Sequence, residues 1–405
     1  MIWAPNSIDA QSQRRSYSKI GHYDEVAVSR DNLHLLPAHR VTKVLLTASD
    51  DEDEAWAASG VSYTPRDGGR GETFEVKARK EVVVSAGTFH TPQVLQRSGI
   101  GPRDVLEDAG VEVKVELPGV GWNFQSHTAF GVSHRFNKAV FPSDSDLLLN
   151  RTFQREAQRQ WDTDKTGPYT AYVNSGAFLP FPVFSNATDE IIAKLEQQSP
   201  EDYLPEGLDP TLVRGFAVQK EILTRQLASK KSAWLEYLFF GQSTTSAILL
   251  HIFSRGTVKI SPNDDGLNTP PVVDYRSFTN PIDLDLNVEL LKGVRWFMGH
   301  QEMVDALRPV ETSPGVNGDA TIRTWLRRNL NPSVAHQVGT SALGPKELGG
   351  VVGPGLTVYG VGRLSVADNS VVPLVPGSHT SALAYAIGEK VRYPEQTSPK
   401  AFPRH

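Results

Sequence analysis

The residues VADNSVVPLVPGSHTSALAYAIGEKV, Val366–Val391, decide the fold, and they carry one histidine, His379, near their middle. The apolar residues before them predict a buried strand that ends at Val366. Two prolines then disfavour helix in the connecting segment. Apolar residues next recur at helical spacing and indicate an amphipathic helix: Leu383, Ile387 and Val391. His379 therefore lies just before or at a helix N-terminus, where the helix dipole favours negative charge.

A second histidine, His336, lies upstream in the sequence NPSVAHQVGTSALG of residues 331–344. Its separation of 43 residues from His379 is too long for one helix face and suits two loops that meet at one site. Histidine is the side chain best suited to proton transfer near neutral pH. A histidine in a loop is nevertheless more often a structural, hydrogen-bonded residue than a catalyst, so spacing alone leaves both interpretations open.

Four stretches of this region resemble, in order and in interval, the C-terminal signature of the glucose–methanol–choline (GMC) flavoprotein oxidoreductases: HQVGT, GGVV, VYGVGRLSVADNSVVP and PGSHTSALAYAIGEK. The resemblance implies that the chain binds flavin adenine dinucleotide (FAD) and oxidises a small-molecule alcohol. It also implies a catalytic role for each histidine. His336 matches the base that takes the alcohol proton, and His379 matches the residue that binds the same hydroxyl.

The stretch SAGTFHTPQVLQRSGIG, residues 85–101, closely resembles the second GMC signature. Its pattern predicts a short buried strand that runs into Gly87, then a helix with Thr91 as N-cap and Pro92 at the first position. By the resemblance, the backbone of Val41 meets the adenine end of the cofactor and Asp368 lies near its ribityl and pyrophosphate. We expect cofactor contacts at five residues: Val41, Gly87, Asp368, Asn369 and Thr380.

A third stretch, LPGVGWNFQSH at residues 117–127, resembles the family pattern P-G-V-G-x-N-L-Q-D-H. Ser126 stands where the family usually has aspartate, so the partner of His127 is left open. We expect His127 to be a structural, hydrogen-bonded histidine rather than a catalyst.

The composition is that of an ordinary globular protein, with 405 residues, 39% hydrophobic and 21% charged. A net charge of −5 gives no indication of a nucleic-acid partner. No apolar run approaches the roughly 18–20 residues that span a bilayer, so we expect no transmembrane segment. The absence of cysteine excludes disulfides and thiol catalysis, and no helix pairs histidines at metal-ligand spacing, so we expect no metal site.

The sequence leaves the cellular compartment open. Met1–Pro5 lack the basic and apolar regions of a signal peptide, so the chain is expected to be cytoplasmic, or secreted if it is truncated at its N-terminus. In a secreted protein Asn150 and Asn186 would be glycosylation acceptors, because each begins an Asn-x-Thr triplet.

We expect a mixed α/β fold of the α+β kind, with an incomplete FAD-binding domain of the GMC type and a substrate domain that contains an antiparallel sheet. Residues 1–127 form the FAD-binding region without its first βαβ unit, and residues 128–325 form the substrate-binding domain. Residues 326–405 return to the FAD-binding domain and bring both candidate histidines to it.

The G-x-G-x-x-G turn with which family members seat the pyrophosphate has no counterpart in this sequence. We expect that the chain is a truncated form of a complete enzyme. Two alternatives stay open as well. Either a partner chain supplies the missing dinucleotide-binding segment, or the protein has lost flavin chemistry.

The expected activity is FAD-dependent oxidation of a primary or secondary alcohol by a GMC-type dehydrogenase or oxidase. The sequence resembles fungal members, which suggests secondary metabolism or the oxidation of aromatic alcohols. Three different functions stay open: a redox-neutral cyclase or lyase, a non-catalytic fragment, and an accessory subunit completed by another chain.

Overall fold

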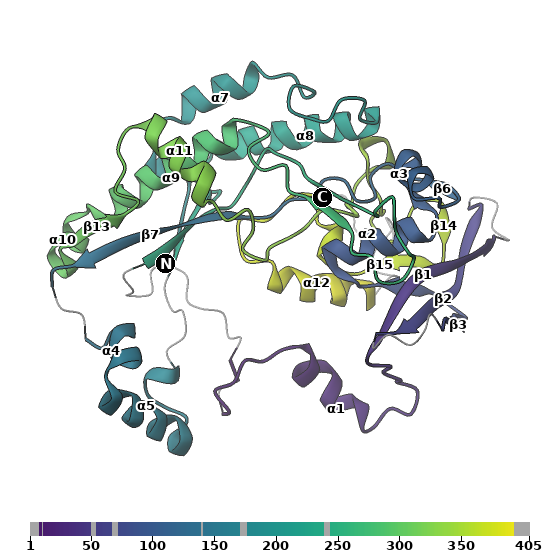
Figure 1. Ribbon diagram of the computed structural model, residues 1–405, viewed down its shortest axis with the longest axis horizontal. Coiled ribbons are helices and arrows are strands. Elements are labelled where there is room, and N and C mark those ends of the chain that lie inside the picture. Colours follow the sequence, from purple (N-terminus) through teal and green to yellow (C-terminus); the bar gives the residue numbers. More distant parts are fainter. Residues whose placement is uncertain are drawn as a thin grey trace, which may run out of the picture.

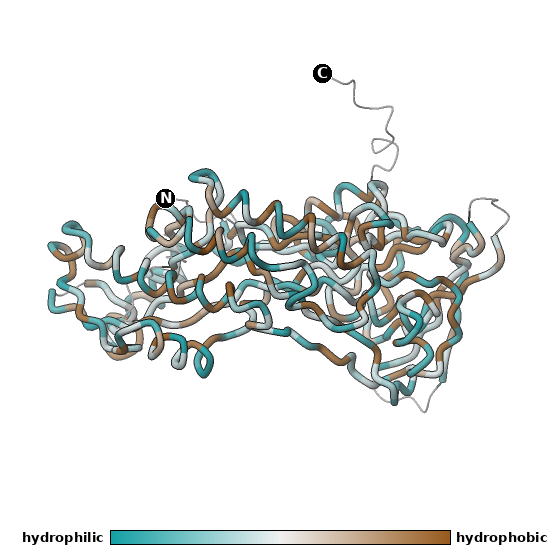
Figure 2. The backbone as a smooth tube through the Cα atoms, turned by 90° about the horizontal axis from the view of Figure 1, so that it is seen from above, coloured by the Kyte–Doolittle hydropathy of each residue, from teal (hydrophilic) through white to brown (hydrophobic). Residues whose placement is uncertain are grey.

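The structure, a computed structural model, describes residues 8–9, 11–49, 54–66, 72–138, 141–170, 176–238 and 244–392. Met1–Pro5, where no signal peptide was expected, lie outside these residues. The described chain is elongated, with a lobe rich in helices on the left of Figure 1 and a lobe of short strands and helices on the right. Hydrophobic and hydrophilic segments alternate along the chain in both lobes (Figure 2). The predicted mixed α/β class is confirmed.

The first lobe joins strands from both ends of the chain. Its main sheet has the order β1-β2-β14, with β3 beside β2: β1 His39–Ala48, β2 Trp56–Pro65, β3 Phe74–Lys77 and β14 Val361–Gly362. A short parallel sheet contacts it: β4 Val82–Val84 and β15 Leu364–Val366. Helix α2, Gly87–Arg97, follows β4 and packs against β1. The pairing of β15 with β4 brings the C-terminal segment back to the N-terminal strands.

The second lobe is built on an antiparallel sheet of five strands in the order β13-β7-β10-β9-β8: β7 Thr128–Phe136, β8 Gly176–Leu179, β9 Leu235–Leu238, β10 Thr244–Leu249 and β13 Pro309–Ser313. Helix α9, Ile282–Met298, packs on β10, and four further helices contact it: α6 Phe181–Phe184, α7 Thr188–Glu196, α10 Gln301–Leu307 and α11 Asp319–Asn329. Helix α8, Pro210–Leu227, packs on α7. The antiparallel sheet expected for the substrate domain is therefore present.

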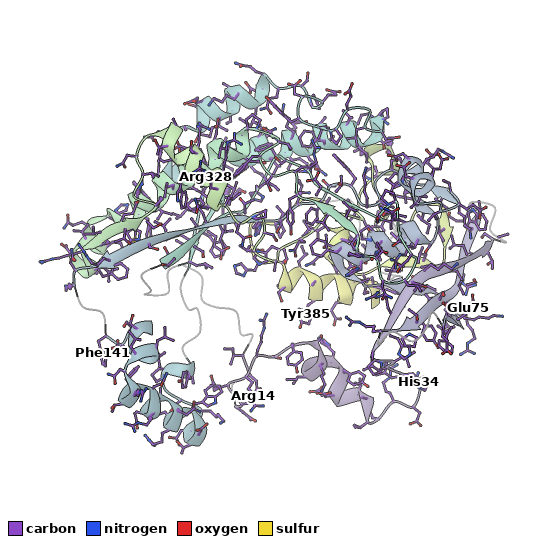
Figure 3. The ribbon with its side chains drawn as sticks, in the orientation of Figure 1. Arg14, His34, Glu75, Phe141, Arg328 and Tyr385 are labelled. Atoms are coloured by element: carbon purple, nitrogen blue, oxygen red, sulfur yellow. The ribbon has the colours of Figure 1, made fainter. Side chains whose placement is uncertain are left out.

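The remaining described elements are η1 Lys19–Tyr23, α1 Asp24–Ala27, β5 Ile100–Gly101, α3 Arg103–Asp108, β6 Val115–Glu116, α4 Asp144–Leu149, α5 Arg151–Asp164, η2 Pro168–Thr170, β11 Thr257–Lys259, β12 Val272–Asp274, η3 Lys346–Leu348, η4 Asn369–Val371 and α12 Ser381–Arg392. The helix expected around Leu383 is α12. Tyr385 of α12, labelled in Figure 3, stacks on His22 of the N-terminal segment, with ring centroids 5.9 Å apart. This contact ties the N-terminal segment to the first lobe.

Each lobe has its own hydrophobic core. The core of the first lobe combines buried residues between Val44 and Val120 with buried residues between Val338 and Ile387. The core of the second lobe draws its buried residues from the range between Phe130 and Leu326. The expected domain boundaries, after residues 127 and 325, stay predictions.

Helix α2 begins earlier than the sequence predicted. Thr91 and Pro92, expected at its start, lie inside a helix that begins at Gly87. Pro92 has no N–H, so the carbonyl of Thr88 lacks its helical donor. The hydroxyl of Thr340 donates to this carbonyl at 2.6 Å instead. The predicted start was wrong because a tertiary hydrogen bond satisfies the group that proline leaves free.

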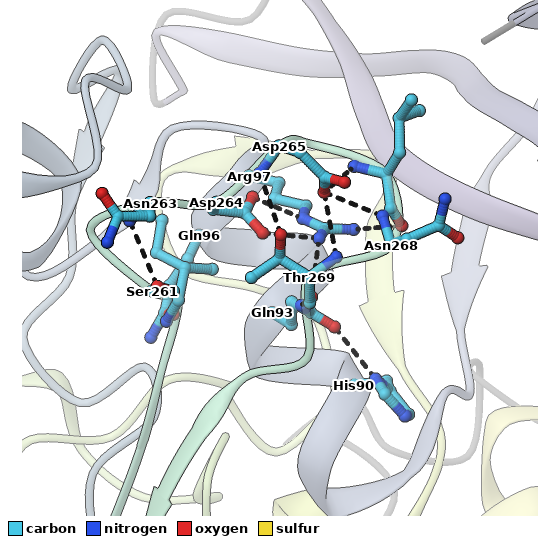
Figure 4. Close-up of polar contacts among 12 residues, drawn as sticks. His90, Gln93, Gln96, Arg97, Ser261, Asn263, Asp264, Asp265, Asn268 and Thr269 are labelled. Carbon is cyan, nitrogen blue, oxygen red and sulfur yellow. Dashed lines mark hydrogen bonds and ion pairs between the residues drawn. The ribbon is translucent and has the colours of Figure 1, made fainter.

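A buried ion pair fastens the loop between β11 and β12 to α2 (Figure 4). Arg97 donates from two nitrogens to both carboxylate oxygens of Asp264, at 2.8 and 2.6 Å. It also donates to the carbonyls of Leu267 and Thr269. The two charged side chains are only 5% and 4% exposed, so each depends on the other for compensation of its charge.

We predict that Asp264→Ala lowers the free energy of unfolding by about 3–5 kcal/mol, because it leaves the buried Arg97 guanidinium without its countercharge. The matched control is Glu116→Ala, since its partner Arg103 is 53% exposed. Loss of that surface pair should cost less than about 1 kcal/mol. Urea-induced unfolding measures both values, and equal losses would show that the buried pair does not hold the loop.

Candidate active site

The structure brings the two predicted histidines together. His336 lies on the loop that follows α11, and His379 lies two residues before α12. Their ring centroids are 4.6 Å apart, with the rings tilted by 56°. The side chain of His379 is half exposed and His336 is partly buried. Two loops that are distant in sequence therefore meet at one site, as their spacing suggested.

The segment Asn123–His127 holds both loops in place. The backbone of Gln125 pairs with Val338, two residues after His336, through hydrogen bonds of 3.1 and 2.9 Å. The side chain of Gln125 donates to the carbonyl of Pro373 at 3.0 Å, and Asn123 donates to the same carbonyl at 2.9 Å. Pro373 lies on the loop that carries His379. One buried segment thus contacts the loops of both histidines.

His127 lies directly against His336. Its Nδ1 is 2.9 Å from Nδ1 of His336, and its Nε2 is 2.9 Å from the carbonyl oxygen of Pro376. Its neighbour Ser126, which stands where the family usually has aspartate, pairs with Ser333 at 2.8 Å. The sequence predicted a hydrogen-bonded histidine at position 127, and the structure gives its two partners.

Sequence reasoning missed Glu236, on β9. Its carboxylate is fully buried, and Oε1 lies 2.6 Å from Nε2 of His379. Its second oxygen, Oε2, is buried without a hydrogen-bond partner among the described residues. The one signal in the sequence is an acidic residue inside the apolar, aromatic run that begins at Trp234. A carboxylate in a buried strand needs a cationic or donor partner.

The environment shifts the pKa values of the three histidines in different directions. Burial, and then the nearby charge of His379, lower the pKa of His336 from 6.5 to about 4. Burial is also the main cause that lowers the pKa of His127 to about 3. The hydrogen bond to Glu236 raises the pKa of His379. His336 and His127 are therefore neutral at physiological pH, whereas the contact with Glu236 makes protonation of His379 easier than in a free histidine.

Four of the five expected cofactor residues lie close together at the start of α2. The N–H of Gly87 donates to Oδ2 of Asp368 at 2.9 Å, and the hydroxyl of Thr91 donates to the same oxygen. The amide of Asn369 reaches the carbonyl of Thr380 at 3.5 Å. These contacts join the start of α2, the 3-10 turn η4 and the segment before α12.

Val41, the fifth expected cofactor residue, lies apart from this group. It occupies β1 opposite Tyr63, next to a register shift, and the residue is 42% exposed. The N–H of Val44 on the same strand donates to the hydroxyl of Ser98, just beyond the end of α2. The start of α2 is roughly 16 Å from Ser98 along the helix. Val41 thus lies on the strand whose Val44 contacts the residue just beyond the C-terminal end of α2, whereas Gly87 begins that helix.

The described part of the chain offers neither a membrane span nor a metal centre. None of its helices is long and apolar enough to cross a bilayer. No three of its His, Asp or Glu side chains are grouped so that they could hold a metal ion.

Two family models match the chain, and both are described as GMC oxidoreductase. The N-terminal model matches residues 7–129, which include Gly87 and His127. The C-terminal model matches residues 253–388, which include His336 and His379. Both models thus cover residues of the candidate site.

Three relatives match nearly the whole chain. The dehydrogenase xptC of Emericella nidulans is 35% identical over 394 residues, which are 95% of this chain and 61% of that protein. An FAD-dependent oxidoreductase from Chaetomium thermophilum superposes with a TM-score of 0.90 at 34% identity, covering 98% of this chain and 67% of that one. A fungal aryl-alcohol oxidase superposes with a TM-score of 0.88 at 34% identity, covering 97% and 65%.

The chain spans about three fifths of the length of the curated relatives it matches. In each of these relatives one chain carries both the matched region and the remainder, so the comparison does not support a separate partner chain. The two family models together match more than half of this chain. The chain therefore belongs to the GMC oxidoreductase family.

Proposed function

We propose that the chain is part of an enzyme that oxidises an alcohol with FAD, and that His336 and His379 handle the hydroxyl proton. The observation that carries this proposal is a pair of histidines 4.6 Å apart whose pKa values are shifted in opposite directions. Environments that separate two pKa values in this way are typical of an acid–base pair. The aryl-alcohol oxidase among the relatives supports an aromatic alcohol as substrate.

His336 is the proposed base. Its pKa of about 4 keeps the ring neutral at physiological pH, so one ring nitrogen offers a lone pair. An alcohol hydroxyl placed against that nitrogen gives its proton to His336 while the carbinol carbon gives up a hydride. Bound FAD supplies the acceptor for the hydride.

His379 is proposed to hold the substrate oxygen. Its Nε2 donates to the buried carboxylate of Glu236 at 2.6 Å. In the protonated ring, Nδ1 also carries a hydrogen and can donate to the alcohol oxygen. The positive charge would then stabilise the negative charge that develops on this oxygen as the proton leaves.

The residues at the start of α2 fit a bound cofactor. Ala86 provides no side-chain cap, and the carboxylate of Asp368 accepts a hydrogen bond from the first N–H of the helix, on Gly87. Gly87 has φ of +80° and open space beside its Cα. Asn369 Oδ1 is buried without a partner in the described part of the chain. We propose that five residues contact FAD: Val41, Gly87, Asp368, Asn369 and Thr380.

We predict that His336→Ala lowers kcat by about 10²–10⁴, because a positioned base is lost. The assay uses FAD-loaded enzyme and a panel of primary and secondary alcohols that includes aromatic ones. Bound flavin, measured by visible absorbance, separates loss of the base from loss of the cofactor. His300→Ala, which removes an exposed histidine, is the matched control. A His336→Ala enzyme within tenfold of the parent would rule out this base.

The acid limb of kcat/KM should lie near pH 4, since His336 accepts a proton only while it is neutral. Activity is lost as the pH falls through this value and the ring becomes protonated. His379→Asn removes the nearby charge, so the limb should move up but stay below pH 6.5 because burial remains. A pH profile of the parent with its acid limb at 6.5 or higher would contradict the assignment.

Glu236→Gln should move the alkaline limb of the same profile to lower pH. The carboxylate raises the pKa of His379, and an amide of the same shape removes that effect, so His379 loses its proton earlier as the pH rises. The acid limb should stay near pH 4. Glu221→Gln, at an exposed position of α8, is the control. An alkaline limb that Glu236→Gln leaves unchanged would exclude protonated His379 from the reaction.

A further inference from the structure

The hydrogen bonds of His127 form a chain with a defined direction. The chain starts at the carbonyl of Pro376, which lies 2.9 Å from Nε2 of His127. A carbonyl oxygen only accepts hydrogen bonds, so Nε2 of His127 must carry the hydrogen. The side chain of His127 is completely buried, which leaves no water to replace this acceptor.

The second nitrogen of His127 is therefore an acceptor. Burial holds the pKa of His127 at about 3, so the ring keeps a single hydrogen at neutral pH. With that hydrogen on Nε2, Nδ1 has a lone pair. The only way to make the 2.9 Å contact between the two Nδ1 atoms a hydrogen bond is for Nδ1 of His336 to donate.

The direction of this contact decides which nitrogen of His336 is basic. His336 is also neutral, with a pKa of about 4, so a hydrogen on Nδ1 leaves the lone pair on Nε2. No other described residue forms a hydrogen bond with Nε2 of His336. In the opposite tautomer Nε2 would carry a hydrogen and could not accept a proton from an alcohol.

We propose that His127 is a positioning residue that fixes the tautomer of His336, so that Nε2 of His336 carries the lone pair that takes the substrate proton. The inference rests on the proposed function in one respect only, namely that the proton comes from a substrate alcohol. The tautomer itself is a property of this chain and can be measured without substrate or cofactor.

A neutral histidine has a different effect from a carboxylate in this position. A carboxylate beside His336 would fix the same tautomer, but its charge would raise the pKa of the ring. His127 fixes the tautomer without adding charge, so His336 stays deprotonated to a lower pH. The Ser126–Ser333 contact next to it is likewise uncharged. The site therefore orients its base through neutral groups.

The test is nitrogen–proton correlation NMR of the chain labelled with ¹⁵N-histidine at neutral pH, with His336 assigned from the spectrum of His336→Ala. We expect His336 to be protonated on Nδ1. In His127→Leu the acceptor is lost, and we expect a shift toward the Nε2-protonated form that free imidazole side chains prefer. His127→Asn keeps an acceptor oxygen near the position of Nδ1 and should restore the parent tautomer.

The control is His134→Leu, which removes another buried histidine about 20 Å along β7 and should leave His336 unchanged. An Nε2-protonated His336 in the parent would overturn the inference, even if no variant folds. A folded His127→Leu whose His336 stays protonated on Nδ1 would overturn it as well.

Turnover gives a second readout. In the FAD-loaded enzyme, His127→Leu should lower kcat by about 10–100-fold with a smaller change in KM, and His127→Asn should recover most of the loss. A parent enzyme with the expected tautomer but no alcohol oxidation would refute the proposed function and leave the tautomer inference standing. Normal turnover in His127→Leu would overturn the role of His127.

Discussion

The loop that leads to His379 depends on the carbonyl oxygen of Pro373, which accepts hydrogen bonds from the side-chain amides of Asn123, Gln125 and Gln219. The fully buried guanidinium of Arg255 donates to the oxygens of Asn123 and Gln219, at 3.0 and 2.9 Å. Each of these two amides therefore has its oxygen bound by the arginine and its nitrogen free to donate to the carbonyl. A buried polar group that lacks a hydrogen bond destabilises the folded protein strongly. This network therefore defines the path of the loop that leads to His379.

The chemistry of the site follows from the group that forms a hydrogen bond with each of the two histidines. A buried carboxylate, Glu236, contacts His379 and favours its charged form. A neutral ring, His127, contacts His336, and burial favours the uncharged form there. Two imidazole rings whose centroids are 4.6 Å apart thus have pKa values that are shifted in opposite directions. The difference arises from partners contributed by β9 and by the segment before β7, neither of which carries a predicted catalytic residue.

Much of the fold could be predicted because local patterns and tertiary packing agree. The periodic apolar residues around Leu383 predicted α12, and the apolar run that ends at Val366 predicted β15. The prediction that Pro92 begins the helix was wrong. Proline is favoured at the first helical position because no carbonyl then lacks its donor, but this preference ignores donors from other parts of the fold. Thr340, which is 252 residues from Thr88 in sequence, supplies the donor that proline lacks. No window of sequence around Pro92 contains that information.

The sequence by itself determined the chemical types at the site, because the motifs around His336 and His379 state which side chains lie on which loops. It also determined that the two loops lie near strand and helix ends, where a cofactor can approach. Only the tertiary structure decided which groups form hydrogen bonds with the two imidazole rings. Hydrogen-bond direction, burial and charge depend on atoms within a few ångströms, and these come from residues far apart in the chain. For that reason the roles of Glu236 and His127 emerge only after folding.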